Sequence, residues 1–221
     1  MVANHSHNVH PVTISFSEQI ATGIFLFGFK KDFEFSAGQV IGIAQEEHGP
    51  RRLYSICSGE QDDEVLILYN IIEEGYLTPR LSELESGDII WITEPRGEFI
   101  CNEEPAVWIA TGTGIAPFYS MLRTGLASQK ILIHGSRTLE QFHFYDDFKT
   151  LLGSNYIRCS TAERDRDVYS GRVTEYLEEQ SILNTGVKYY LCGSAEMVVE
   201  TRDILISKGI PFDQIVSEIY F

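Results

Sequence analysis

The glycine-rich segment at residues 111–117, which reads TGTGIAP, has the residue types and spacing of an anion-binding turn. It follows a short apolar run and precedes a segment that can form a helix. Backbone N–H groups at such a turn can point at an anion, and the helix dipole adds to the attraction. Pro117 stands where G-x-G-x-x-G would place a third glycine, and no Lys-Ser/Thr follows, so a nucleotide-hydrolysing phosphate loop is disfavoured. Taken alone, the turn could equally be a tight strand-to-helix connection.

A second candidate lies at residues 51–58, which read RRLYSICS. Alternate side chains of a strand share a face, so Arg52 and Tyr54 are expected on one face and Leu53 and Ser55 on the other. An arginine can bind phosphate, a ring can stack, and a hydroxyl can reach a ring heteroatom. Together they suit a planar, phosphorylated ligand, although an ordinary edge strand could carry the same residues.

The composition narrows the class of protein. The chain has 221 residues, of which 43% are hydrophobic and 22% charged, and its formal net charge is −15. This is typical of a globular enzyme, and no apolar run is long enough to span a membrane. Residues 1–104 hold 6 Lys and Arg against 18 Asp and Glu, whereas residues 105–221 hold 11 against 14. Such an acidic chain is not expected to bind nucleic acid electrostatically, and the asymmetry suggests two halves with different ligands.

The cysteines and histidines give no sign of a metal. The four cysteines are widely spaced, so iron–sulfur and zinc centres are not expected, and reduced thiols fit a cytoplasmic protein. Residues 1–11 lack the pattern of a secretory signal. The polar terminus that contains His5, His7 and His10 is interpreted as a flexible tail and not as a metal tract. The cysteines are Cys57, Cys101, Cys159 and Cys192.

The hydrophobic pattern changes between the two halves. Residues 1–104 hold six short β-branched and aromatic runs separated by turn residues, which predict an antiparallel barrel or sandwich, with one short helical segment at residues 78–85. Residues 105–221 alternate apolar runs with helical patterns, which predict a parallel sheet wrapped by helices. The helical segments are expected at residues 115–126, 138–152, 170–180 and 195–209. The boundary falls near the Glu103-Glu104-Pro105 segment.

Open parallel sheets bind ligands outside the carboxyl ends of their strands. Three predicted strand ends carry unusual residues: the glycine turn, residues 134–137 (HGSR) and residues 192–194 (CGS). We therefore expect them to line a common crevice.

Five motifs follow one another in a specific order: RLYS, GYLTPRL, GTGIAP, LCG and a terminal EIYF. This ordered set resembles the ferredoxin/flavodoxin–NADP(+) reductase family, particularly its short bacterial type, and the resemblance covers residues 9–221. It implies an FAD-binding antiparallel β-barrel over residues 1–104 and an NADP-binding α/β domain over residues 105–221. It also implies that a flavin and a nicotinamide ring meet face to face between the two halves.

The resemblance assigns roles in the first half. Arg52 would bind the FAD pyrophosphate, Tyr54 would pack on the flavin, and Ser55 would approach flavin N5. Thr78 would hold the pyrophosphate through its hydroxyl, and the same residue could instead, or in addition, cap the helix that follows. The cofactor-binding residues implied are Arg52, Leu53, Tyr54, Ser55, Leu68, Tyr69, Asn70, Gly75, Tyr76, Leu77, Thr78, Thr113, Tyr220 and Phe221.

In the second half the resemblance implies a site for the pyridine nucleotide, with cations at the 2′-phosphate that favour NADPH over NADH. One departure counts against this preference: where the family often has Ser-Arg, this chain has Thr161-Ala162-Glu163-Arg164. Glu163 could repel the phosphate unless Arg164 or Arg166 compensates, and Arg166 could simply pair with nearby carboxylates. The NADP-binding residues implied are Thr111, Gly112, Thr113, Gly114, Arg137, Arg164, Arg172, Cys192 and Gly193.

Four residues resemble the catalytic set of the family: Ser55, Cys192, Glu218 and Tyr220. Hydride transfer needs alignment more than acid–base groups. Cys192 would be a small contact beside the nicotinamide, Glu218 would help to position Ser55 and the ring, and Tyr220 would stack on the flavin. Phe221 could cover the adenine of a folded FAD, or both terminal aromatic residues could close the core as part of the last strand.

The function implied is transfer of electrons between NADPH and a separate one-electron carrier such as ferredoxin or flavodoxin, with FAD as the converter. Because such carriers are generally acidic, docking would need a local basic rim, for which the candidates are Lys30, Lys31, Arg51, Arg80 and Arg96. Two alternatives stay open: a reductase of free flavin, and an electron-transfer subunit of a larger complex.

Overall fold

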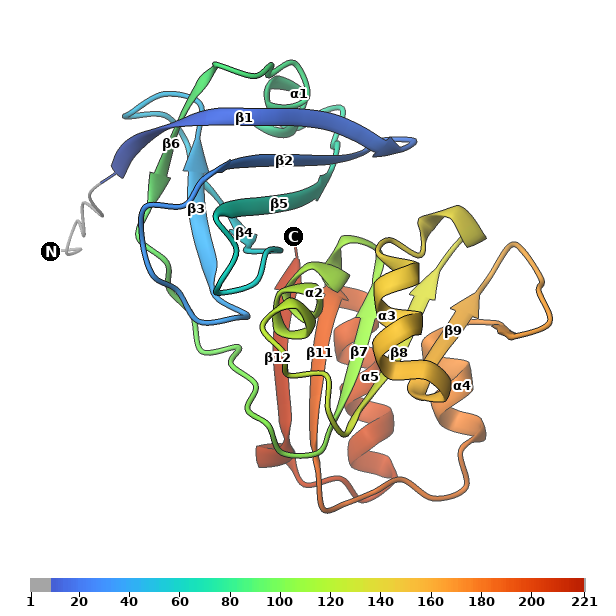
Figure 1. The fold of residues 1–221 in the computed structure, drawn as a ribbon. Helices are drawn as coiled ribbons and strands as arrows, with labels where there is room; N and C mark the ends of the chain where they lie inside the picture. The colour runs from blue at the N-terminus through green and yellow to red at the C-terminus, as the bar shows by residue number, and fades with distance from the viewer. Residues whose placement is uncertain (1–8, 221) are drawn as a thin grey trace, which may run out of the picture. The chain divides into compact units, whose positions relative to one another are not determined.

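The structure is a computed structural model that describes residues 9–220 (Figure 1). The chain divides into two compact units, one ending at Ile100 and the other beginning at Cys101. The described residues contain no helix long and apolar enough to cross a membrane. The four cysteines are free thiols, and all are buried. His5, His7 and Phe221 lie outside the described residues.

The first unit is built on a six-stranded antiparallel sheet, as the sequence predicts. The strand order is β4-β3-β6-β1-β2-β5. The two outer strands are joined by a bridge between Ile56 and Ile67 and by a 2.8 Å bond from the Cys57 N–H to the Leu66 carbonyl, which closes the sheet into a barrel. The strands are β1 (Val9–Ala21), β2 (Ile24–Lys30), β3 (Val40–Ala44), β4 (Arg52–Ser55), β5 (Glu64–Asn70) and β6 (Ile89–Thr93).

Apolar side chains from every wall fill this barrel. Phe27, Phe29, Ile41 and Ile67 are among the fully buried members of one hydrophobic cluster. His10 belongs to β1, where it pairs with Ile92 of β6. The interpretation of His10 as part of a flexible tail is therefore wrong, because the first strand begins three residues earlier than its apolar run suggests.

The one helix of the barrel unit is shorter than predicted. α1 spans only Thr78–Leu81, although the helical pattern continues to residue 85. The Ser82 hydroxyl bonds to the Pro79 carbonyl, and the Glu85 N–H bonds to the Asp88 carboxylate, so turns replace the second helical turn.

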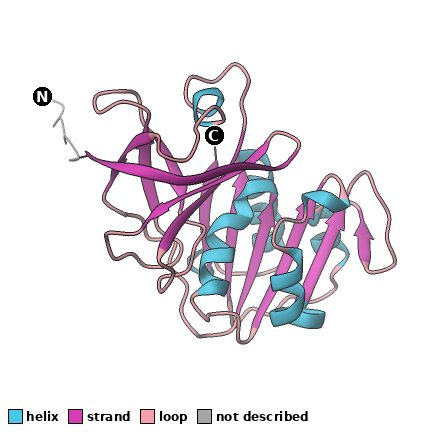
Figure 2. Cartoon of the chain, turned by 45° about the horizontal axis from the view of Figure 1, so that its top comes forward, coloured by secondary structure: helices cyan, strands magenta, loops and turns pink. Residues whose placement is uncertain are grey.

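The second unit is a six-stranded parallel sheet with the order β10-β9-β8-β7-β11-β12. Helices α2 and α3 lie on one face, and α4 and α5 on the other (Figures 1 and 2). The strands are β7 (Ala106–Thr111), β8 (Lys130–Ser136), β9 (Tyr156–Ser160), β10 (Val168–Ser170), β11 (Lys188–Ser194) and β12 (Ile215–Tyr220). The helices are α2 (Ala116–Arg123), α3 (Tyr145–Leu152), α4 (Val173–Glu179) and α5 (Ala195–Ser207). The sequence predicts this layered sheet, apart from the short strand β10.

One predicted helix is broken in two. Residues 138–152 form the 3₁₀-helix η2 (Leu139–Gln141) and then α3, with Phe144 between them in a left-handed conformation at φ 59°. The break lets Phe142 and His143 point into the core, and it stacks the Phe144 ring on Tyr119 with 3.7 Å between ring centroids. Burial of these rings outweighs continuity of the helix.

A buried histidine lies under this aromatic segment. His134 of β8 is fully buried, and its Nδ1 lies 3.0 Å from the Tyr156 hydroxyl, whereas its Nε2 has no hydrogen-bond partner among residues 9–220. Burial, with smaller contributions from the charges of His143 and Arg158, lowers the pKa of His134 to about 3. The imidazole is therefore neutral throughout the physiological range.

This burial predicts a pH dependence of stability. Between the ordinary pKa of 6.5 and about 3, the unfolded chain binds a proton at this position that the folded chain does not. The free energy of unfolding should therefore fall by about 3 kcal/mol between pH 6.5 and pH 4 on account of His134. Urea unfolding at a series of pH values measures this fall, and His134→Asn, which keeps a polar atom near Tyr156 but does not titrate, should show a shallower one.

His48→Asn is the matched control, because His48 is exposed. It should leave the pH dependence unchanged. If the free energy of unfolding fell equally with pH in the wild type and in His134→Asn, the buried imidazole would not be the cause of the pH dependence.

Candidate nucleotide-binding sites

Three predicted strand ends come together at the carboxyl edge of the parallel sheet. β7 lies between β8 and β11, with Thr111 opposite Gly135 and Ala110 opposite Cys192. The glycine turn, the HGSR segment and the CGS segment therefore follow three adjacent strands. This is the edge at which open parallel sheets bind ligands.

The two glycines of the turn have different structural roles. The turn is a 3₁₀-helix, η1 (Gly112–Ile115), that leads directly into α2. A Cβ on Gly114 would lie 2.4 Å from the Cys192 carbonyl oxygen, so this glycine allows two backbones to pack together. Gly112 has a φ of +55°, and a Cβ there would meet nothing within 4 Å. The backbone at Gly112 is thus open to a ligand, whereas Gly114 closes the turn onto β11.

The end of β11 shows a second close approach. Gly193 has a φ of +154°, and a Cβ there would lie 2.3 Å from the Thr111 hydroxyl oxygen. Thr111 is half-buried, and Thr113 is buried within η1. Four of the predicted NADP-binding residues (Thr111, Gly114, Cys192 and Gly193) therefore pack against one another.

Three of the four predicted catalytic residues lie together on β11 and β12. Cys192 pairs with Glu218 and Ser194 pairs with Tyr220, so the Glu218 and Tyr220 side chains share the sheet face of Cys192. Burial raises the pKa of the Cys192 thiol well above its usual value, the charge of Glu218 raises it further, and a hydrogen bond from Tyr220 partly opposes both. The neutral thiol is a packing contact and not a nucleophile.

The predicted phosphate-binding arginines all lie on loops. Arg137 follows β8, Arg164 follows β9 and Arg172 precedes α4, and all three are exposed. Arg172 forms an exposed ion pair with Glu196 at 3.8 Å. Asp165 pairs with Arg158 at 3.8 Å, and its carboxylate accepts the backbone N–H of Arg166 at 2.7 Å.

In the barrel, exposure along β4 does not follow a simple alternation. Arg52 and Leu53 are both exposed, Tyr54 is half-buried against the barrel core, and Ser55 is buried. Arg52 and Tyr54 were predicted to share one face of the strand, but they differ in burial. Tyr54 makes an edge-on contact with Tyr69 at 6.2 Å between centroids, and its burial raises its pKa to about 12.

The predicted residues of β5 lie beside this contact. Leu68 and Tyr69 are buried, and Asn70 is exposed. The Tyr69 ring stacks on Phe25 at 5.6 Å, and its hydroxyl is buried without a hydrogen-bond partner. Burial and the neighbouring Tyr54 raise the pKa of Tyr69 well above its usual value.

The predicted phosphate loop of the barrel is closed by its own threonine. The Thr78 hydroxyl accepts the Ile72 N–H at 2.8 Å, and the Gly75 N–H bonds to the Ile72 carbonyl at 2.7 Å. The helix-cap alternative is wrong, because α1 begins at Thr78 itself and no side chain caps it. Leu77 is buried, and Tyr76 is exposed under the Arg80 guanidinium, 4.2 Å from the ring centroid.

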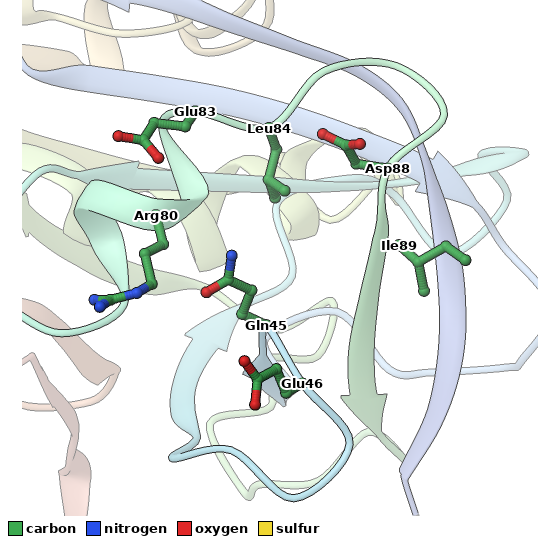
Figure 3. Close-up of a pocket in the computed structure, with 7 residues that line it drawn as sticks. All are labelled: Gln45, Glu46, Arg80, Glu83, Leu84, Asp88 and Ile89. Atoms are coloured by element: carbon green, nitrogen blue, oxygen red, sulfur yellow. The ribbon is translucent and has the colours of Figure 1, made fainter.

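An open pocket that the sequence analysis did not predict lies beside α1. It has a volume of about 380 Å³, and Figure 3 shows the Gln45 amide and the Arg80 guanidinium among its walls. No spacing motif marks it, because its walls come from the end of β3, from α1 and from the start of β6. It is lined by Gln45, Glu46, Arg80, Glu83, Leu84, Asp88 and Ile89.

Together, the barrel and the parallel sheet with its glycine turn define a class of two-unit nucleotide-binding oxidoreductases. Residues 108–203 match a family described as the oxidoreductase NAD-binding domain. A flavodoxin/ferredoxin–NADP reductase of Buchnera aphidicola is 29% identical over 78% of this chain and 80% of its own length. A flavohemoprotein of Bacillus subtilis is 25% identical over 85% of this chain, which spans only 52% of that relative.

A solved structure has the same fold. The crystal structure of a ferredoxin NADP+ reductase from Neisseria gonorrhoeae, with FAD and NADP bound, superposes with a TM-score of 0.87 at 23% identity. The superposition covers 97% of this chain and 99% of that one. The chain is therefore similar in sequence and in fold to ferredoxin/flavodoxin–NADP reductases.

The close approach at Gly114 predicts a sharp difference between two substitutions. Gly114→Ala should destabilise the second unit by several kcal/mol, because its Cβ would collide with the rigid backbone of β11. Gly112→Ala should cost only about 1 kcal/mol, the strain of a left-handed alanine in open space. Thermal unfolding of both variants measures the contrast, and equal stabilities would contradict the proposed packing.

Proposed function

We propose that this protein is an FAD-dependent oxidoreductase that transfers electrons between NADPH and a one-electron protein carrier such as ferredoxin or flavodoxin. The observation that supports it most is the carboxyl edge of the parallel sheet, where an open glycine turn lies beside the Cys192, Glu218 and Tyr220 cluster. A flat nucleotide ring needs such an edge: exposed backbone N–H groups, a small neutral contact and an aromatic side chain.

The barrel residues fit an FAD. Arg52 is exposed and can pair with phosphate, Tyr54 presents a neutral ring, and Ser55 ends the same strand. Ser55 would be the catalytic residue that this unit contributes. FAD would supply the interconversion of two-electron hydride chemistry and one-electron transfer.

The loop that precedes α1 also fits a diphosphate. Thr78 holds the loop closed through Ile72, so the loop keeps its shape without a ligand. The backbone at Tyr76 would provide an N–H donor, whereas the Gly75 N–H is already bonded to the Ile72 carbonyl, and Leu77 anchors the loop in the core. On β5, Leu68, Tyr69 and Asn70 would line the cofactor mainly with backbone groups.

The parallel-sheet unit would bind the pyridine nucleotide. Gly112 and Thr113 would contact its phosphates through the backbone, and Cys192 and Gly193 would lie against the nicotinamide. Glu218 would orient the ring and Tyr220 would stack on the flavin. Arg137 directly follows β8, the strand after the glycine turn, and in doubly wound folds an arginine near such a strand end accommodates a 2′-phosphate. Arg164 and Arg172 would complete that subsite.

The charge of the barrel half would affect how a protein carrier docks. The barrel half has a net charge of −12, and two of its candidate docking cations have internal contacts: the Lys31 amine bonds to the Glu60 carbonyl, and Arg80 stacks on Tyr76. Docking of an acidic carrier would therefore be governed by few exposed cations, and its rate would depend on salt concentration.

A spectroscopic titration tests the proposal as a whole. The purified protein should show flavin absorption bands, and anaerobic NADPH should bleach them. A colourless protein that reduces added flavin would support the free-flavin alternative instead. Flavin bands that neither NADPH nor NADH bleaches would overturn the proposal.

Arg137→Ala tests the 2′-phosphate subsite. Loss of a charge-assisted contact to phosphate should raise the KM for NADPH about tenfold and leave that for NADH nearly unchanged. Lys149→Ala, which removes an exposed cation from α3, is the matched control and should change neither value. An equal loss with both nucleotides would remove the case for 2′-phosphate recognition at Arg137.

A further inference from the structure

The loops after β8 and β9 are bonded into one unit. The Arg137 carbonyl accepts the Ala162 N–H at 3.0 Å and the Ser160 hydroxyl at 2.9 Å. The Thr161 N–H bonds to the Ser136 carbonyl at 3.3 Å. Because of these bonds, the backbone that carries Arg137 is fixed relative to the segment that leads to Arg164.

Glu163 adds a side-chain bond to this framework. Its Oε2 accepts the backbone N–H of Leu139 at 2.7 Å, which joins the loop after β9 to the start of η2. A carboxylate that accepts an N–H makes one of the stronger kinds of hydrogen bond in proteins. The Glu163 N–H also bonds to the Ser160 hydroxyl, at 3.3 Å, so both its backbone and its side chain are held.

A second anchor lies on the other side of Arg164. Asp165 pairs with the Arg158 guanidinium at 3.8 Å. The Arg158 side chain is only 11% exposed, and it lies over the rings of Tyr145 at 4.5 Å and Phe142 at 5.4 Å. Residues 163 and 165 are therefore both tied down, and Arg164 projects from a segment with two fixed flanks.

From this arrangement we infer that Glu163 is a positioning residue for recognition of the nucleotide 2′-phosphate. It holds the Arg137 and Arg164 loops together through the Leu139 amide. This inference rests on the proposed function and reverses the expectation that the Glu163 charge repels the phosphate. Selectivity for NADPH then requires an oxygen at residue 163 that accepts the Leu139 N–H. The negative charge of this residue does not reduce the selectivity.

Two substitutions separate positioning from repulsion. Glu163→Gln removes the charge but keeps an oxygen that can accept the Leu139 N–H. Glu163→Ala removes both the charge and the acceptor. Glu140→Ala is the matched control, because it removes an exposed carboxylate from the same 3₁₀-helix without touching the Leu139–Glu163 bond.

The measurement is KM and kcat for NADPH and for NADH with each variant, together with the melting temperature. Glu163→Ala should raise the KM for NADPH about fivefold to tenfold, with little change in kcat or in the KM for NADH. Glu163→Gln and Glu140→Ala should stay within about twofold of the wild type. A fall in the KM for NADPH with Glu163→Gln would show repulsion and overturn the inference, as would equal changes with both nucleotides or no change with Glu163→Ala.

A binding experiment keeps this test independent of catalysis. Adenosine 2′,5′-bisphosphate and 5′-ADP are probes that differ in the position of one phosphate, and calorimetry gives their affinities for the full chain. Glu163→Ala should weaken only the 2′-phosphate probe. If the wild type binds both probes but oxidises neither NADPH nor NADH, the proposed function fails while the positioning role is still tested. Equal weakening of both probes, or no discrimination between them by the wild type, would overturn the positioning role.

Discussion

The contact between the Gly114 backbone and the Cys192 carbonyl constrains the rest of the nucleotide-binding edge. No side chain fits between them, so η1 must turn directly against the end of β11. This packing brings the Thr111 hydroxyl up to Gly193 and leaves Gly112 as the exposed part of the turn. Parallel pairing of β11 with β12 then fixes Glu218 beside Cys192. The close approach of Gly114 to the Cys192 carbonyl thus determines which chemical groups of η1, β11 and β12 can reach a ligand.

Burial keeps several of the candidate site groups in their neutral forms, and this limits the chemistry that they can perform. The Cys192 thiol and the Tyr54 and Tyr69 phenols are kept in their neutral forms by burial, because a low-dielectric environment disfavours the charged form. None of these groups is suited to abstract a proton or attack a carbonyl at neutral pH. Hydride transfer makes no such demand, since it depends on the alignment and stacking of two rings. The site is therefore better suited to redox chemistry than to hydrolysis.

The sequence predicts the architecture well because both halves have strong hydrophobic periods. The alternating runs that form β1 to β6 and the buried runs that form β7, β8, β11 and β12 are identified from pattern alone. The errors occur where tertiary packing overrides local preference. Residues 138–152 have a helical pattern, yet Phe142 and His143 are buried by a break at Phe144. Thr78 has the spacing of a helix cap, yet its hydroxyl closes a loop through Ile72, a contact that no local rule predicts.

Glu163 shows why the charge of a residue in the sequence does not by itself predict how that residue affects ligand binding. A carboxylate next to Arg164 suggests repulsion of a phosphate, because charges of the same sign repel each other. In an exposed loop that interaction is weakened by water and salt, whereas a direct hydrogen bond to the Leu139 amide is not lost in the same way. The geometry of one acceptor oxygen can then outweigh the charge of the whole group. Only the fold, which brings residues 139 and 163 together across two loops, shows that the Glu163 carboxylate has this hydrogen-bond partner.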